Sequence, residues 1–314
     1  TSSTPQFVDW TGDGKLDILS GCYWTEGADG GHIQLLAGRG GLDFAESIDL
    51  LSGEGKPLLN EALAEDESNQ TSIICVQQHA VDYDGAGDVD LVVGCFGQDF
   101  FFYENKGTAE KPALVTTPQK LALKSPDYHS APHLVDWDGD GDLDLLSGSG
   151  NGGVLYAENT GTRSEPTWSE FQRLIPASQQ SEQLLSEGTS IQPSQSTRVW
   201  ATDWNGDGLL DLLVGDSASL IQPAKGLSLE EFEQKREAHR EALQELARKQ
   251  QPIMEQYMAA REKGEELPED VTKAMQETQA EIQKLFAGQS EFQQAENTGF
   301  VWLYLQKPKP TATK

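Results

Sequence analysis

The sequence is poor in cysteine, in basic residues and in long apolar runs, and each shortage limits what the protein can be. Its three cysteines allow at most one intramolecular disulfide, and we interpret Cys22 and Cys95 as small buried residues at strand ends. No apolar run approaches the roughly 18 residues that a membrane-spanning helix needs. The chain has 23 basic and 51 acidic residues, and its net charge of −28 repels nucleic acid and anionic membranes. We therefore expect no nucleic acid partner and no membrane span.

Motifs that mark catalytic sites are missing as well. The chain has no G-x-S-x-G, no H-E-x-x-H, no C-x-x-C and no phosphate-binding glycine loop. No catalytic residue and no organic cofactor are therefore predicted.

Aspartate is abundant instead, and it is concentrated in a stretch that occurs four times. The copies are DWTGDGKLD at 9–17, DYDGAGDVD at 82–90, DWDGDGDLD at 136–144 and DWNGDGLLD at 203–211. Each copy lies between two short apolar segments, and such runs bounded by Gly, Asn and Asp are typical of β-strands. Three or four strands per unit suit one blade of a β-propeller, and a single blade cannot bury both of its faces. The sequence therefore predicts an all-β fold, a β-propeller of four repeat units.

One segment departs from this pattern. Residues 227–287 are rich in Glu, Gln, Lys and Ala, and their apolar residues follow one another at spacings of three and four. This spacing predicts two helices joined by a turn around Gly264–Pro268. Ser228 and Glu231 fit a capping box at the start, and Gly288 suits the final stop. We predict an antiparallel helical hairpin inserted between two strands of the fourth blade.

The predicted domains follow from this insertion. Residues 1–226 would form blades 1–3 and the first half of blade 4, residues 227–287 the hairpin, and residues 288–314 the last strands of blade 4. The hairpin is either a solvated spacer that packs on itself or a surface for a partner or for self-association.

The aspartate-rich loops have the composition of a site for a hard cation. When each loop is numbered from its first Asp, side-chain oxygens stand at positions 1, 3, 5 and 9, and glycine at position 6 permits a sharp turn. Ca²⁺ takes about six to eight oxygen ligands, and the residue at position 7 can add its backbone carbonyl. The candidate metal ligands are Asp9, Thr11, Asp13, Lys15 and Asp17; Asp82, Asp84, Asp88 and Asp90; Asp136, Asp138, Asp140, Asp142 and Asp144; and Asp203, Asn205, Asp207, Leu209 and Asp211.

The loops differ in predicted strength. Loops 136–144 and 203–211 carry complete ligand sets and are expected to be the strongest of up to four Ca²⁺ sites. Thr11 is a weaker ligand than a carboxylate, and Ala86 leaves position 5 empty, so loop 82–90 is expected to be the weakest. An EF-hand is excluded because position 12 holds no glutamate, and Mg²⁺ is disfavoured because it prefers few carboxylates and several waters. An acidic turn without metal is the alternative, which four in-register copies disfavour.

Histidines and tryptophans recur in the same register as the loops. His79 and His133 stand three residues before consecutive loops, so we expect them at equivalent places on neighbouring inner strands. We interpret them as hydrogen-bonded wall residues, and a metal or catalytic pair near the propeller axis is the alternative. Trp10, Trp137 and Trp204 occupy loop position 2 and are predicted to pack each loop against its blade.

These residues also resemble a known family. The pattern D-x-[DN]-x-[DN]-G-x-x-D-[IL]-[IL] after a short strand resembles the FG-GAP/VCBS repeat of integrin α-subunit propellers and of bacterial surface proteins. The downstream segments GGVLYAENTGTRSEP and FFFYENKGTAEKP are similar to the later strands of those repeats. The resemblance implies a β-propeller with Ca²⁺ in its strand-connecting loops, in a secreted or surface-exposed protein. Family propellers often have about seven blades. With four units here, either the ring is small or the chain belongs to a larger assembly.

Two functions from different classes follow. The first is a non-catalytic, calcium-stabilised scaffold that binds a protein or a glycan in adhesion. The second is a carbohydrate-active enzyme, either a polysaccharide lyase or a glycoside hydrolase. A lyase usually needs a basic cluster, whereas the basic residues here are few and scattered. A glycosidase needs two facing carboxylates, and the 51 acidic residues leave such a pair open. We favour the scaffold.

The expected location is extracellular, at the cell surface or periplasmic. Extracellular calcium modules bind at about 10⁻⁴–10⁻³ M, which external calcium saturates and cytosolic calcium does not. The N-terminal TSSTPQF shows no secretory signal, as expected of a mature chain.

Overall fold

The protein is described by a computed structural model, in which residues 3–23, 31–59, 73–177, 182–184, 192–263 and 267–308 are placed. The chain divides into two compact units. The first comprises Thr1–Ser181, Ser190–Ala218 and Gly299–Lys314, and the second comprises Glu182–Thr189 and Ser219–Thr298. The first unit is built of β-sheets, and the second contains the two helices.

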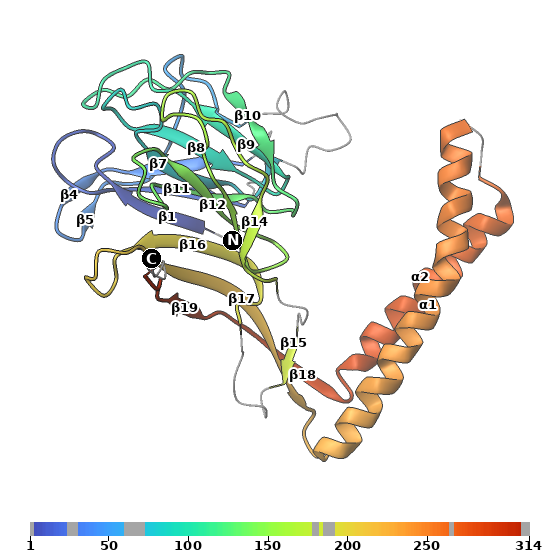
Figure 1. Cartoon of the computed structure of the whole chain (residues 1–314). Coiled ribbons are helices and arrows are strands. Elements are labelled where there is room, and N and C mark those ends of the chain that lie inside the picture. The colour runs from blue at the N-terminus through green and yellow to red at the C-terminus, as the bar shows by residue number, and fades with distance from the viewer. Residues whose placement is uncertain are drawn as a thin grey trace, which may run out of the picture. The chain divides into compact units, whose positions relative to one another are not determined.

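Each aspartate-rich repeat corresponds to one antiparallel sheet of the first unit (Figure 1). Sheet 1 contains β1 (Ser3–Val8), β2 (Asp17–Cys22), β3 (Ile33–Leu36) and β6 (Ile48–Asp49). Sheet 2 contains β7 (Gln77–Val81), β8 (Asp90–Gly94), β9 (Asp99–Tyr103) and β10 (Gln119–Lys124). Sheet 3 contains β11 (Ala131–Val135), β12 (Asp144–Gly148), β13 (Val154–Ala157) and β14 (Gln172–Ile175). Sheet 4 is built on β17 (Asp211–Pro223), which pairs with β16 (Gln195–Thr202) and β19 (Val301–Tyr304). A short pair, β4 (Gly38–Gly40) and β5 (Asp43–Phe44), follows β3.

The burial of the strands reflects their place in this series. Sheets 2 and 3 pack on a neighbour on both faces, and all five residues of β9 are buried. A strand buried on both faces reads as a continuous apolar run, as in the sequence DFFFY of β9. The residues of β2 instead alternate between buried and half-buried, because sheet 1 packs on a neighbour on one face only.

Three hydrophobic cores join successive sheets. The core between sheets 1 and 2 includes Leu19, Leu35, Val93 and Phe101. The core between sheets 2 and 3 includes Val92, Phe102, Leu134 and Leu145. The core between sheets 3 and 4 includes Leu146, Tyr156, Val199 and Leu212. Among the residues that the structure describes, no such core joins sheet 4 to sheet 1. The fold is therefore a series of four packed sheets, in which ring closure is not seen.

Side chains of the first strand in each sheet bind the backbone of the next sheet. The Gln6 amide pairs with Ala80, donating from Nε2 to the carbonyl (3.0 Å) and accepting the N–H at Oε1 (2.8 Å). His79 hydrogen-bonds the backbone of Leu134. Nε2 of His133 accepts the Ala201 N–H at 3.1 Å. One contact thus recurs at three successive junctions.

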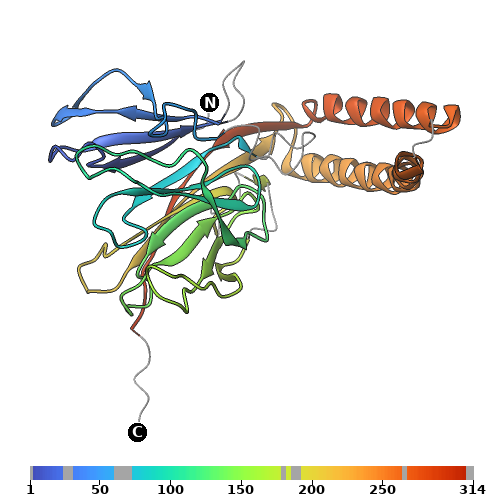
Figure 2. The same cartoon turned by 90° about the horizontal axis from the view of Figure 1, so that it is seen from above.

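The second unit contains the predicted pair of helices. The helices α1 (Leu229–Lys263) and α2 (Glu269–Gln289) lie side by side in both views (Figures 1 and 2). Two strands of this unit, β15 (Glu182–Leu184) and β18 (Gln293–Thr298), pair with β17. The unit is therefore wider than the 227–287 insertion that the sequence predicts. No helix in the described part of the chain is long and apolar enough to cross a membrane.

The start of α1 confirms the predicted capping box. The Ser228 hydroxyl oxygen accepts the Glu231 N–H at 3.2 Å, and the Glu231 carboxylate accepts the Ser228 N–H at 2.9 Å. The predicted stop at Gly288 is wrong, because α2 runs on to Gln289 and Ser290 follows in helical conformation. The predicted turn at Gly264–Pro268 lies largely outside the described residues.

Cysteine plays no cross-linking role in this fold. Cys22, Cys75 and Cys95 are all free thiols, and the last two are buried. The interpretation of Cys22 and Cys95 as residues at strand ends agrees with the end of β2 at Cys22 and of β8 just before Cys95. The prediction that both are buried is wrong for Cys22, which is half-buried because it lies at the end of a strand whose residues alternate in burial.

Candidate metal-binding loops

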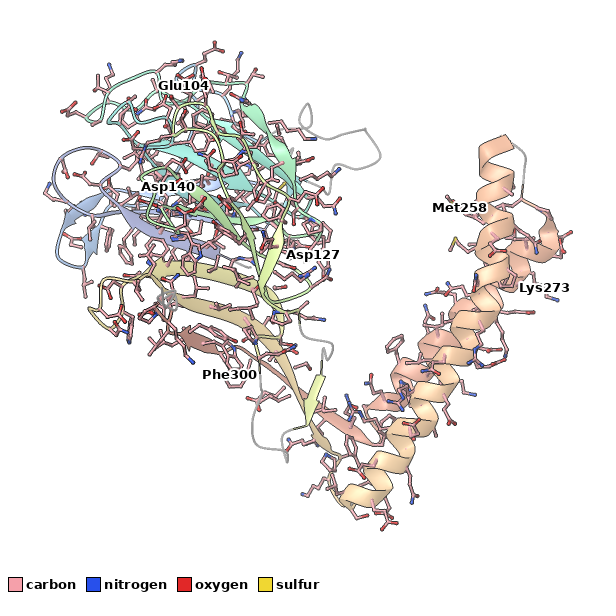
Figure 3. The ribbon with its side chains drawn as sticks, viewed as in Figure 1. Glu104, Asp127, Asp140, Met258, Lys273 and Phe300 are labelled. Atoms are coloured by element: carbon pink, nitrogen blue, oxygen red, sulfur yellow. The ribbon has the colours of Figure 1, made fainter. Side chains whose placement is uncertain are left out.

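The four aspartate-rich loops share one backbone geometry. Each loop joins the first strand of a sheet to the second. The loop that contains Asp140, for example, joins β11 to β12 (Figure 3). Glycine occupies positions 4 and 6 in every copy, and all eight glycines have positive φ: Gly12, Gly14, Gly85, Gly87, Gly139, Gly141, Gly206 and Gly208. Residues with a side chain rarely adopt this conformation, so the repeated glycines allow the loop to turn twice within three residues.

The aspartate at position 1 stabilises the turn of the loop, because its carboxylate accepts hydrogen bonds from the loop backbone. Oδ1 of Asp136 accepts the Gly139 N–H at 2.8 Å, and Oδ2 accepts the Gly141 N–H at 3.1 Å. Asp203 makes the same pair of contacts, at 2.7 Å and 3.0 Å. In both loops the first carboxylate is thereby placed at the centre of the turn.

The aspartate at position 9 is fully buried in all four repeats and ties the loop to the third strand. One carboxylate oxygen of Asp144 accepts the Trp137 N–H of the loop at 3.2 Å, and the other accepts the Asn159 N–H after β13 at 2.9 Å. The same two-sided contact is made by Asp17 with Thr11 and Gly38, by Asp90 with Tyr83 and Asn105, and by Asp211 with Trp204 and Gln306. We call these four residues the clamp aspartates.

Two loops gather three carboxylates within 4.8 Å of one another. They are Asp82, Asp84 and Asp90 in the second loop, and Asp136, Asp138 and Asp140 in the third. In the first and fourth loops position 3 is Thr11 or Asn205, which leaves fewer carboxylates to gather. The second loop, predicted to be the weakest site, thus brings three carboxylates together despite Ala86. The predicted order of strength among the loops stays a prediction.

The remaining predicted ligands lie in the same loops. Position 7 is Lys15, Asp88, Asp142 or Leu209, and Asp142 is nearly buried. Asp13 and Asp207 at position 5 accept the N–H of the residue two places on, at 3.0 Å and 2.9 Å. The loop carboxylates therefore have further lone pairs for a cation.

The acidic loops keep their negative charges at a cost. Burial raises the pKa of Asp90 to about 6. Burial and then repulsion from Asp140 and Asp144 raise the pKa of Asp142. Burial likewise raises the pKa of Asp144. A raised carboxyl pKa means that the protein disfavours the ionised form, and a bound cation would reverse that preference.

Basic side chains stand close to two loops. Nζ of Lys15 lies 2.6 Å from the carboxylate of Asp13, and its hydrogen bond holds the pKa of Asp13 below the ordinary value. In the second loop, the Arg163 guanidinium donates to the backbone carbonyl of Asp82 and lies 3.7 Å from its carboxylate. The third loop has five aspartates, and no ion pair involves them in the described residues.

Sequence reasoning took position 9 for a plain ligand and missed its role as a clamp. It also missed Asn105 and Asn159, which are buried after the third strands of sheets 2 and 3. Oδ1 of Asn159 accepts the N–H groups of Gly161 and Thr167, as Oδ1 of Asn105 does in the equivalent turn. The repeated letters EN-x-G were the signal that could have identified these turns.

Comparison with known proteins agrees with this geometry. Residues 82–147 and 136–214 match the FG-GAP-like repeat family. Residues 82–214 therefore contain FG-GAP-like repeats. The match covers the second, third and fourth FG-GAP-like loops, and the first loop shares their two positive-φ glycines and their clamp aspartate.

One solved structure similar to this chain is the pore of the Tc holotoxin of Photorhabdus luminescens. The identity is 18% and the TM-score 0.36, and the alignment covers 67% of this chain and 8% of that chain. This chain therefore spans about a twelfth of that neighbour's length. No curated protein matches it.

The predicted neighbourhood of the two histidines is confirmed. The rings of His79 and His133 are 4.5 Å apart between centroids, nearly perpendicular, and both are buried. They line a cavity of about 310 Å³ together with residues from the first strand of every sheet, among them Gln6, Trp200 and Arg198. Arg198 forms no ion pair with any described carboxylate. This cavity could accept a small ligand with hydrogen-bonding groups.

Acidification is expected to destabilise the protein through His79. Burial lowers its pKa to about 4, against 6.5 in an unfolded chain. As the pH falls through 6.5, the unfolded chain takes up a proton that the folded chain refuses, so stability is full above 6.5 and is lost toward pH 4. His79 alone should contribute about 2 to 3 kcal/mol to the loss between pH 7.5 and 4.5 in urea unfolding. Burial lowers the pKa of His129 to about 4 as well, so His79→Gln should show a smaller loss without abolishing it. If the free energy of unfolding fell equally with pH in the unmodified protein and in His79→Gln, the loss would not come from His79.

Proposed function

We propose that this chain is a non-catalytic, calcium-stabilised repeat scaffold that binds a protein or a glycan outside the cytoplasm. The observation that carries the proposal is the gathering of carboxylates in loops of one repeated geometry, three of them within 4.8 Å in two loops. Hard cations with about six to eight oxygen ligands fit this donor set, and Ca²⁺ tolerates several carboxylates where Mg²⁺ keeps its waters. The finer architecture we propose is that of a β-propeller, with each sheet as one blade.

The distribution of basic residues favours a scaffold over the alternative, a polysaccharide lyase or glycoside hydrolase. A lyase needs free cations beside its acidic substrate. Here Lys15 pairs with Asp13, Lys120 with Asp99 and Arg173 with Asp127. These three cations are neutralised within the protein, whereas Arg198 in the histidine cavity is a single cation without an ion pair to a described carboxylate and not the basic cluster that a lyase usually needs.

The proposed location is extracellular, at the cell surface or periplasmic, where calcium is abundant. The helical hairpin is a second element for a partner or for self-association. Met254, Met258 (Figure 3) and Phe286 are large apolar side chains exposed on it. Flexible methionines suit an adaptable protein-binding surface.

Calcium is expected to raise the melting temperature by at least about 5 °C after chelator treatment. At about 1 mM calcium, each site with a dissociation constant of about 10⁻⁴ M adds about 1.4 kcal/mol, and two to four sites add to one another. Circular dichroism with and without calcium measures the shift, and titration calorimetry counts the sites.

A variant pair makes this test specific to the loops. The double variant Asp138→Asn with Asp140→Asn should lose part of the shift and one site. Glu170→Gln removes an exposed charge elsewhere in the same unit and should keep both. An equal melting temperature with and without calcium, together with no binding heat, would overturn the proposal.

A further inference from the structure

Each sheet of the first unit has two faces that recur from repeat to repeat. The forward face packs on the following sheet, and the backward face packs on the preceding one. The four repeats share one register, so equivalent positions can be compared from sheet to sheet. Three junctions are filled by hydrophobic cores. The two faces that remain are the forward face of sheet 4 and the backward face of sheet 1.

The aromatic residue at loop position 2 belongs to the forward face. Trp10 packs in the core between sheets 1 and 2 with 3% of its surface exposed, and Tyr83 packs in the next core with 6%. Trp137 packs against the core between sheets 3 and 4. Trp204 is 60% exposed. The prediction that this tryptophan packs its loop against the blade is therefore wrong for the fourth repeat, because no sheet among the placed residues covers its forward face.

The apolar pairs on the second and third strands repeat this contrast. Leu19 lies opposite Leu35, Val92 opposite Phe102, and Leu146 opposite Tyr156, and all six are buried in the junction cores. The equivalent pair in sheet 4 is Leu213 opposite Leu303, and Leu303 is 44% exposed. Beside it, Val301 is 75% exposed. Sheet 4 thus presents an apolar face of the same composition as the buried ones, without a cover.

A repeated glycine gives the sharpest evidence. Gly21, Gly94 and Gly148 stand at one equivalent position, and a Cβ there would lie 2.1–2.2 Å from a backbone carbonyl oxygen of the next sheet. That oxygen belongs to Val76 or Ser130, each directly before the first strand, or to Thr197 within it. These glycines exist to let that backbone approach. Gly215 is the fourth member of the set, and a Cβ there would meet nothing within 4 Å. Sheet 4 has the gap for a neighbouring strand. Gly215 and Leu213 face the histidine cavity there, which β1 also lines, and no described strand comes within 4 Å of a Cβ at Gly215.

Sheet 1 shows the complementary opening on its backward face. Two residues before each loop, Ala80, Leu134 and Ala201 are buried against the preceding sheet. The equivalent residue of sheet 1 is Phe7, which is 56% exposed. It lies opposite Ile18, which is half-buried. The described part of the chain therefore carries both halves of one more junction, and no described sheet covers either half.

We propose that the forward face of sheet 4 binds the backward face of sheet 1 of a second copy of this chain, in a two-fold symmetric dimer. A two-fold axis pairs the two faces twice, so that all four uncovered faces are buried at once and no further copy can add. The first strand of the partner would bring a backbone carbonyl against Gly215, as Thr197 does at Gly148. Trp200 and Trp204 would become buried by the contact.

The first test is the molar mass of the unmodified chain in solution. Size-exclusion chromatography with light scattering, at physiological salt and about 1 to 100 µM protein, is expected to give twice the 34.3 kDa of the chain. A monomer over this whole range would overturn the proposal.

Variants then locate the contact. Gly215→Val places a side chain where the partner's strand would lie, and since nothing in the single chain meets a Cβ there, the fold should be kept. We expect at least a tenfold weaker dimer. Leu42→Asp is the control, because Leu42 is fully exposed in the loop between β4 and β5 and should leave the dimer unchanged.

Other occupants of the face give different results. If sheet 1 of the same chain closes on sheet 4, Gly215→Val lowers the melting temperature while the mass stays that of one chain, which overturns the proposal. If the dimer forms through the helices, Gly215→Val leaves the mass doubled, whereas Met258→Glu on α1 halves it, and this result also overturns the proposal.

Discussion

Replacing Asp144 by asparagine is expected to lower the free energy of unfolding by about 3 kcal/mol in the absence of calcium. Asp144 is buried, and its two oxygens accept the N–H groups of Trp137 and Asn159. Asparagine has one oxygen, so its NH₂ group would face one of these two donors. One buried N–H then loses its partner, and the remaining bond loses its charged acceptor. Each of these losses costs about 1–3 kcal/mol.

Urea unfolding in excess chelator, followed by tryptophan fluorescence, measures this effect. Asp140→Asn is the matched control, since it removes the same charge from the same loop. Asp140 is exposed, and an asparagine oxygen can still accept the Asp142 N–H. The control should change stability by less than about 0.5 kcal/mol. Equal losses in the two variants would mean that charge, and not the clamp, sets the stability of the loop.

Replacing Gly148 by alanine is expected to cost about 3 kcal/mol or more, because the new methyl group has no room. Its Cβ would lie 2.1 Å from the carbonyl oxygen of Thr197, which belongs to the first strand of sheet 4. Backbone at a packed junction moves only if the neighbouring sheet moves with it. Overpacking of this kind typically costs about 1–3 kcal/mol, and more where the backbone itself is met.

Gly215→Ala is the matched control for this prediction. It is the same substitution at the equivalent place in the next repeat, where a Cβ meets nothing within 4 Å. At a protein concentration low enough to keep the chain monomeric, thermal unfolding should show a change near zero. Similar losses for Gly148→Ala and Gly215→Ala under these conditions would contradict an uncovered fourth sheet.

The repeat, the loops and the helical segment could all be predicted from the sequence, because each has a local signature. The four loops carry their glycines and aspartates at fixed spacing, and the capping box of α1 is contained in Ser228 and Glu231. Both signals depend on neighbouring residues only. The same holds for His79 and His133, whose equal offsets from their loops placed them on neighbouring strands.

The uncovered junction could not be predicted in the same way. Trp204 and Gly215 look like Trp10 and Gly21 in the sequence, because a repeat encodes the same residues whether or not a neighbour covers them. What differs is the presence of another sheet, which is a property of the assembled fold. The clamp aspartates were misread for a related reason. A buried carboxylate that accepts two backbone N–H groups has the same letter as an exposed ligand.

The contacts from Gln6 to Ala80 and from His133 to Ala201 make each sheet depend on its immediate neighbours and on little else. Such a molecule resembles a one-dimensional chain of coupled units, in which the cooperativity of unfolding depends on the interface between each sheet and the next, here called a link. An end unit is held by one link, and an inner unit by two. In a single copy, unfolding should therefore start in sheets 1 and 4. Sheets 2 and 3, which carry His79 and His133 and have two links each, should lose their order last.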